Sequence, residues 1–167
     1  AGAYAQLPRY FADADQVMDL ETRLLYCMTT LQGRTREEAT KRVFGNADRP
    51  SEFEYLVSYV VGQARGFPMN APTSHPQEQA SYELGKKVFF YRAGAWDFSC
   101  ASCHGSATDS MKGVATRYPA VDAGTGELRN LEGRINHCRT VNQRAQPYAY
   151  ESDELLGLTA FVAGQSL

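Results

Sequence analysis

Apolar residues recur every three or four positions in several stretches of this chain, the spacing that places them on one face of an α-helix. The clearest stretch covers residues 15–32, where the apolar positions are Val17, Leu20, Leu24, Leu25, Met28 and Leu31. The same pattern predicts helices over residues 51–64, 77–92, 130–141 and 152–163. No stretch shows sustained alternation of apolar and polar residues, so we expect an all-α fold.

Local signals mark the ends of these helices. Ser51, with Glu54 three residues later, forms a capping box at the start of one helix. Gly33 follows the first helix as a plausible stop. We interpret residues 69–76 as a linker between two units, because prolines cluster there: Pro68, Pro72 and Pro76.

A second copy of one helical segment lies later in the chain. Residues 20–27 and 131–138 both read L-E-x-R-x-x-x-C, at an offset of 111 positions, and Pro8 aligns with Pro119 at the same offset. A further match, at an offset of 102 positions, pairs residues 59–63 with residues 161–165. Self-similarity of this kind predicts two copies of one unit in tandem.

Cys100–His104 reads C-x-x-C-H, the attachment signature of c-type haem. Zinc would require a second pair of ligands at zinc spacing, and a thioredoxin-like dithiol would require a βαβ pattern. The sequence shows neither. It therefore predicts one covalent haem c, attached through Cys100 and Cys103, with His104 as an axial ligand of the iron.

The motif divides the chain into a part with haem and a part without. We expect residues 1–68 to form a haem-less cytochrome c-like unit and residues 77–167 to form a cytochrome c domain with haem, joined by residues 69–76. The first unit carries the longer loop, around residues 32–50. Its equivalent of the haem motif would fall before Ala1, so we interpret this unit as N-terminally incomplete, whether trimmed or without haem altogether.

Composition narrows the class of protein further. The formal net charge of −2 at pH 7 argues against nucleic acid as a partner. No apolar run has the length of a membrane span, so we expect no membrane insertion. No signal peptide starts at Ala1, and covalent haem c is assembled outside the cytoplasm in bacteria. We therefore expect a mature chain of the periplasm whose export signal has been removed.

Three residues compete for the remaining axial position on the iron. Met111 follows His104 by only seven residues, so we interpret it as a packing residue of the loop. His137 would give bis-histidine ligation, but the first copy holds Tyr26 in its place. We favour Cys138, because it lies on a helix 34 residues beyond His104 and a thiolate is a strong donor.

Arg134 precedes Cys138 by one helical turn, so both side chains project from the same helix face. We expect its positive charge to favour the thiolate form of the cysteine and to hold an anion beside the sulfur. Arg139 is a second candidate for binding the anion, although it could simply face solvent. Arg23 and Cys27 repeat the spacing without a haem motif, so we interpret Cys27 as a relic, a structural thiol or half of a disulfide.

The sequence resembles the A subunit of the SoxAX cytochromes, the L-cysteine S-thiosulfotransferases of bacterial sulfur oxidation. The resemblance covers nearly the whole chain and rests on four segments: 82–87, 100–105, 111–119 and 131–139. It implies that His104 and Cys138 are the axial ligands of an active-site haem. It also implies that Cys138 is modified to a persulfide and that Arg134 is an active-site residue.

The resemblance further implies a reaction that joins thiosulfate to a cysteine of the SoxYZ carrier protein, with two electrons leaving through haem to a small c-type cytochrome, the SoxX subunit. With one haem motif, the sequence resembles a single-haem form or a truncated two-haem form. A single haem accepts one electron at a time, so we expect the chain alone to be incomplete as an enzyme. Two other functions stay open: a plain periplasmic electron-transfer cytochrome c, and a haem-bearing sensor in which Cys138 dissociates to admit a ligand.

Overall fold

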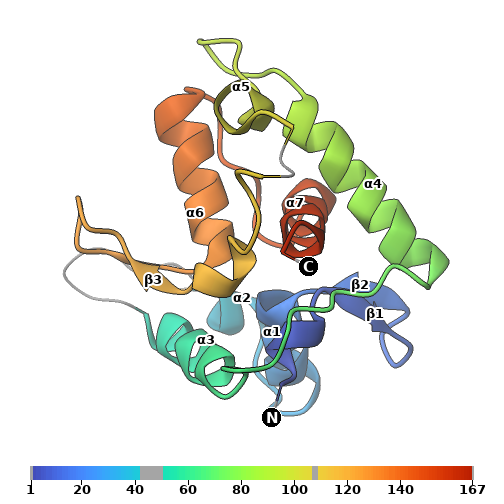
Figure 1. Ribbon diagram of the computed structural model, residues 1–167. Helices are drawn as coiled ribbons and strands as arrows, with labels where there is room; N and C mark the ends of the chain where they lie inside the picture. Colours follow the sequence, from blue (N-terminus) through green and yellow to red (C-terminus); the bar gives the residue numbers. More distant parts are fainter. Residues whose placement is uncertain (1, 42–50, 107–108, 167) are drawn as a thin grey trace.

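The computed structural model describes residues 2–41, 51–106 and 109–166, and its elements are mainly helical (Figure 1). The α-helices are α1 (Leu20–Thr30), α2 (Arg36–Thr40), α3 (Glu52–Gly62), α4 (Pro76–Phe90), α5 (Cys100–His104), α6 (Leu131–His137) and α7 (Asp153–Gly164). Two short 3-10 turns are η1 (Tyr4–Gln6) and η2 (Ala115–Arg117), and η3 (Cys138–Asn142) is a π-helical turn that continues α6. None of these helices combines the length and apolar character needed to cross a membrane.

The helices lie where the sequence pattern predicts them, and side-chain caps fix their starts. Ser51 accepts a hydrogen bond from the backbone of Glu54, and the Glu54 carboxylate accepts one from the backbone of Ser51, which completes the predicted capping box of α3. Ser152 caps α7 with a single bond, which its side chain accepts from the backbone N–H of Leu155. Within the predicted longer loop, residues 36–40 form the short helix α2, and residues 42–50 lie outside the described residues.

Two β-hairpins correct the prediction of an all-α fold. Strand β1 (Arg9–Phe11) pairs antiparallel with β2 (Gln16–Met18), and β3 (Ala120–Val121) pairs antiparallel with β4 (Leu128–Arg129). Strands of two or three residues are too short to show an alternating pattern, which is why the sequence did not reveal them. Because β2 occupies the start of the predicted helix 15–32, α1 begins only at Leu20.

The two hairpins repeat each other residue for residue. Arg9 faces Met18 in the first and Ala120 faces Arg129 in the second, and both pairs are related by the offset of 111 positions seen in the sequence. In both copies the residue that follows the second strand caps the next helix through a side-chain oxygen. The repeated unit at this offset is therefore a hairpin, a cap and a helix.

Helices α4 and α7 cross at a pair of glycines, and α7 lies between α4 and α6 (Figure 1). A Cβ atom built on Gly85 of α4 would lie 1.8 Å from the carbonyl oxygen of Gly157 in α7. Only glycine permits this approach of the two backbones, because any side chain at position 85 would overlap α7. The crossing brings Phe89 and Phe161 together, with ring centroids 5.1 Å apart.

The apolar core falls into two clusters, and the part of the chain before α4 contributes to both. Leu7, Leu25 and Val57 belong to the cluster formed by the first half. Met69 and Ala71, which lie in the predicted linker, are buried in the cluster of the second half. The segment that joins the two predicted units is therefore part of a packed core.

Candidate functional site

One apolar pocket brings together most of the candidate site residues that the sequence analysis selected. These residues are Cys100, Cys103, His104, Met111, Arg134, Cys138 and Arg139. Much of the remaining lining is aliphatic or aromatic: Val88, Phe89, Phe98, Val114, Tyr118, Leu131, Ile135, Tyr148, Leu158 and Val162. Helices α4, α5, α6 and α7 and the π-turn η3 all contribute to this wall.

The C-x-x-C-H motif folds as the short helix α5 at one side of the pocket. Ser99 caps it by accepting a hydrogen bond from the backbone of Ser102, and Gly105 ends it with a φ of 58°. In a helix, residues three apart lie on the same face, so the thiols of Cys100 and Cys103 both reach the pocket. His104 follows directly and lines the same space.

The candidates for the remaining axial position lie in two different places. Cys138 lines the pocket, and so does Met111, which is buried in the adjoining core. His137 instead lines a neighbouring cavity together with Glu127 and Arg129. Burial, Arg129 and Arg134 lower the pKa of His137. Sulfur donors rather than a second imidazole therefore share the pocket with His104.

Arg134 and Arg139 both line the pocket but are held differently. Arg139 donates to the carbonyl oxygen of Gln146 at 2.5 Å, and its guanidinium carbon lies 3.9 Å from the ring centroid of Tyr148. Arg134 donates one hydrogen bond, from Nη1 to Oδ2 of Asp122 at 3.2 Å. The Arg139 guanidinium is thus engaged in packing the pocket wall, whereas Arg134 keeps donors that no described residue uses.

The residues of the pocket fit haem c. The described cysteines are all free thiols, and burial, with the nearby Cys138 as the second cause, raises the pKa of Cys100. Two thiols one helical turn apart suit the two vinyl groups, and His104 offers an imidazole for the iron. The apolar wall suits a flat, largely apolar macrocycle.

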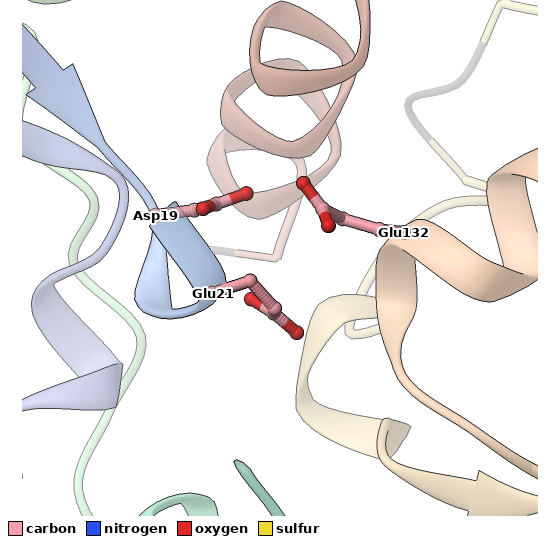
Figure 2. A group of neighbouring side chains, drawn as sticks. All are labelled: Asp19, Glu21 and Glu132. Atoms are coloured by element: carbon pink, nitrogen blue, oxygen red, sulfur yellow. The ribbon is translucent and has the colours of Figure 1, made fainter. Parts of the chain in front are cut away.

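A second cluster, which the sequence analysis missed, lies where the two halves meet. Figure 2 shows Asp19 and Glu21 from the start of α1 pointing toward Glu132 of α6, and carboxylate oxygens of the three lie within 4.8 Å of one another. All three residues are buried. The signal was present in the repeat, because Glu21 and Glu132 occupy the same position of L-E-x-R-x-x-x-C.

Burial makes the two glutamates of this carboxyl cluster weaker acids than usual. Burial raises the pKa of Glu21 to about 8, and the charge of Asp19 adds to the rise. Burial and the charges of Asp19 and Glu21 hold the pKa of Glu132 well above its ordinary range. Asn130 donates to Glu21 at 2.8 Å, so the cluster also ties α1 to the start of α6. We therefore assign it a role in joining the halves.

Comparisons with known proteins place the chain in a family. A sequence model of the SoxA/TsdA cytochrome c domain matches residues 1–69 and 84–167. The L-cysteine S-thiosulfotransferase subunit SoxA of Hydrogenophilus thermoluteolus is 34% identical over 176 residues, which cover 97% of this chain and 64% of that protein. A subunit of the same name from Hydrogenobacter thermophilus is 33% identical and covers 99% of this chain and 64% of its own length.

The fold agrees with the same family. The crystal structure of SoxXA from P. pantotrophus includes a chain that superposes with a TM-score of 0.80 at 22% identity, over 99% of this chain and 61% of that one. The present chain thus spans slightly less than two thirds of the length of these relatives. The resemblance inferred from the residues is confirmed at the level of the family, and the chain belongs to the SoxA/TsdA cytochrome c domain family.

Proposed function

We propose that this chain is the part of a SoxA-type subunit that holds haem c and joins thiosulfate to a cysteine of a SoxYZ-type carrier protein. The observation that carries the proposal is the meeting of the C-x-x-C-H turn, Cys138 and Arg134 in one pocket. A plain electron carrier needs the haem turn and an axial ligand. Electron transfer does not require an arginine that binds an anion in the same pocket as a thiol.

Four side chains would hold the cofactor. Cys100 and Cys103 attach haem c covalently, and His104 and Cys138 are the ligands of its iron. When bound, haem c supplies a one-electron acceptor within the pocket. The apolar wall around these residues excludes water and lowers the local dielectric constant, which strengthens the attraction of Arg134 for an anion.

Arg134 binds the thiosulfate dianion beside the Cys138 sulfur through charge-assisted hydrogen bonds. The Cys138 thiolate and thiosulfate form one S–S bond and release two electrons, which gives Cys138–S–S–SO₃⁻. The thiolate of the carrier cysteine then attacks the sulfur atom next to the sulfonate group. The carrier leaves as its S–S–SO₃⁻ derivative, and Cys138 returns as a thiolate; the same balance holds if Cys138 carries one extra sulfur as a persulfide.

The electron balance requires a partner. Two electrons leave in each turnover and one haem takes up a single electron at a time, so a second acceptor is needed. A SoxX-type c-type cytochrome would fill this role, and we place the reaction in the periplasm, where haem c and such partners are found together.

We also propose that the chain contains two related cytochrome c-like units, of which only the second carries haem. The repeated hairpin, cap and helix at an offset of 111 positions support this division. Residues 1–68 would form the first unit and residues 77–167 the second, with residues 69–76 between them.

One observation favours a second candidate function. Met111 lines the same pocket as Cys138 and carries the thioether that is typical of electron-transfer cytochromes. If Met111 rather than Cys138 binds the iron, the chain is a plain periplasmic electron-transfer cytochrome c.

Two measurements on the haem-loaded chain in complex with its partner decide between these functions. Mass spectrometry of the Cys138 peptide is expected to find an added sulfur atom. Arg134→Ala is expected to lower thiosulfate-dependent turnover about a hundredfold, the effect of losing hydrogen bonds to a charged group, and to leave the haem spectrum unchanged. Arg23→Ala, the equivalent change in the first half, should leave turnover intact. An unmodified Cys138 together with no thiosulfate-dependent turnover of the wild-type complex would establish the electron carrier instead, and normal turnover of Arg134→Ala would remove the role proposed for Arg134.

A further inference from the structure

Asp122 stands at the start of the turn between β3 and β4, and each of its carboxylate oxygens has a separate set of partners. Oδ1 accepts hydrogen bonds from the backbone N–H groups of Gly124 at 2.9 Å and Thr125 at 3.1 Å. Oδ2 accepts the hydrogen bond from Arg134 and lies 3.8 Å from Nε of Arg129. The first oxygen fixes the carboxylate in its own hairpin, and the second faces the arginine of the pocket.

The hairpin gives this carboxylate a fixed position and a fixed charge. Backbone hydrogen bonds of 2.8 Å close the turn on both sides, from Asp122 N–H to the Glu127 carbonyl and from Gly126 N–H to the Asp122 carbonyl. The N–H groups of Thr125 and Gly124, followed by the charges of Arg129 and Arg134, lower the pKa of Asp122. The side chain is therefore an anion throughout the neutral pH range.

Arg134 is held at a single point as a result. Among the described residues, Asp122 is its one hydrogen-bond and ion-pair partner, and the bond uses only Nη1. A guanidinium group has five N–H donors in a rigid plane, so fixing one nitrogen orients the others. The side chain is about one third exposed and lines the pocket beside Cys138.

The first half of the chain shows an arginine that is held at two points at the equivalent position. Arg23 donates to both oxygens of Asp13, at 3.0 and 2.8 Å, and its guanidinium carbon lies 4.3 Å from the ring centroid of Phe11. At the offset of 111 positions, Gly124 replaces Asp13 and Asp122 replaces Phe11. Arg23 in the first half is thus held by two hydrogen bonds, whereas Arg134 in the second half is held by one.

We propose that Asp122 is a positioning residue that holds one edge of Arg134 so that its other donors face an anion next to Cys138. This inference rests on the proposed function, in which that anion is thiosulfate. Asp122 itself touches neither the anion nor the sulfur; it acts through the orientation of the guanidinium group.

The test is Asp122→Asn in the haem-loaded chain assembled with its partner. An asparagine Oδ1 can still accept the hydrogen bonds of the turn, but its amide group faces the arginines with a donor, so the contacts with Arg134 and Arg129 are lost and the turn is kept. We expect KM for thiosulfate to rise about tenfold, as for one charge-assisted hydrogen bond, with a smaller change in kcat. Titration calorimetry with thiosulfate should show the same loss of affinity.

The direction of the change in KM for thiosulfate separates a positioning role of Asp122 from a direct effect of its charge on the anion. Removing a negative charge near the pocket would by itself strengthen the binding of a dianion, so an unchanged or lower KM in Asp122→Asn overturns the proposal. Asp13→Asn is the matched control, because it removes the clamp of Arg23 and should leave KM unchanged. An equal rise in KM in both variants also overturns the proposal, since it would reflect general loosening of the hairpins.

Arg134→Ala distinguishes failure of this inference from failure of the proposed function. If Arg134→Ala lowers thiosulfate affinity and Asp122→Asn does not, the role of Asp122 is wrong and the function stands. If neither variant affects thiosulfate binding or turnover, Arg134 does not bind the substrate and both proposals fall. Asp122→Glu keeps the charge but lengthens the side chain, and a KM between those of wild type and Asp122→Asn would support positioning.

Discussion

The two halves of the molecule build the same hairpin and the same helix, yet only one of them leaves its arginine and cysteine facing a pocket lined by the haem motif. In the first half, Tyr26 donates from its hydroxyl to the backbone of Asp13, the residue that also clamps Arg23. In the second half, Gly124 stands where Asp13 would be, and Cys138 lines a pocket. An arginine four residues before a cysteine is therefore a structural element where both of its terminal nitrogens bind one carboxylate. It is available to a ligand where one edge is free.

The most severe test of this comparison replaces each of the two cysteines with serine in turn. Cys138→Ser in the haem-loaded complex is expected to abolish thiosulfate-dependent turnover and to change the absorption spectrum of haem, because it removes both the relay sulfur and an iron ligand. Cys27→Ser should leave turnover within about twofold of wild type, as for a surface substitution with little effect on stability. Steady-state kinetics and absorption spectra measure both effects. Equal losses in the two variants would show that the halves do not differ in function.

The sequence predicts the helices and most of the candidate site because both depend on short-range patterns. The C-x-x-C-H turn and the L-E-x-R-x-x-x-C helix each place their residues by helical periodicity, and the pocket contains the cysteines and histidine of the first and the arginine and cysteine of the second. The sequence did not indicate a role for Asp122. Its contact with Arg134 joins residues 12 positions apart, and the hairpin that carries it is too short to show a hydrophobic pattern. The first copy gave no hint either, since Phe11 occupies the equivalent position.

The carboxyl cluster was missed for a different reason. Glu21 and Glu132 lie in the first turns of their helices, where acidic residues are common because of the helix dipole. Nothing in either segment alone indicates burial. Only the fold brings the start of α1 next to the start of α6, where Glu132 meets Glu21 and Asp19, which lie 111 and 113 residues away along the chain.

The carboxyl cluster predicts that the joint between the halves weakens as pH rises. Glu21 has a folded-state pKa of about 8 against 4.5 when unfolded, and the pKa of Glu132 is raised as well. The folded state therefore binds more protons than the unfolded chain, so the free energy of unfolding should fall between about pH 4.5 and pH 8. With one pKa unit worth about 1.4 kcal/mol, the shift of Glu21 alone corresponds to a loss on the order of 5 kcal/mol. Urea denaturation across this range measures it.

Asp19→Asn is the matched variant for the cluster, because asparagine already occupies the equivalent position 130 and caps α6 there. The change keeps a side-chain cap for α1 but removes the charge that adds to the raised pKa of both glutamates. We expect the pH dependence to end at a lower pH and the protein to gain stability near pH 8. A denaturation profile identical to that of wild type would mean that Asp19 is not part of the cluster in solution.

The smallest predicted effect concerns the glycines that end the last helix of each half. Gly62 of α3 and Gly164 of α7 are equivalent at the offset of 102 positions, but their surroundings differ. A Cβ at Gly62 would meet no atom within 4 Å, whereas one at Gly164 would lie 2.7 Å from Cε2 of Tyr82. Tyr82 is held in turn by a hydrogen bond of 3.0 Å from Gln165, so its ring cannot move away without breaking that bond.

Gly62→Ala should therefore stabilise the protein by about 0.5–1 kcal/mol, because alanine loses less conformational entropy in a helix. Gly164→Ala should destabilise it by about 1–2 kcal/mol, because the added methyl group overpacks the core against Tyr82. Chemical denaturation of the two variants under the same conditions measures the difference. Changes of opposite sign in the free energy of unfolding would show that the last helix is packed more tightly in the second half than in the first. If both substitutions stabilise the protein, the Tyr82 ring can move aside and the last helices of the two halves are packed alike.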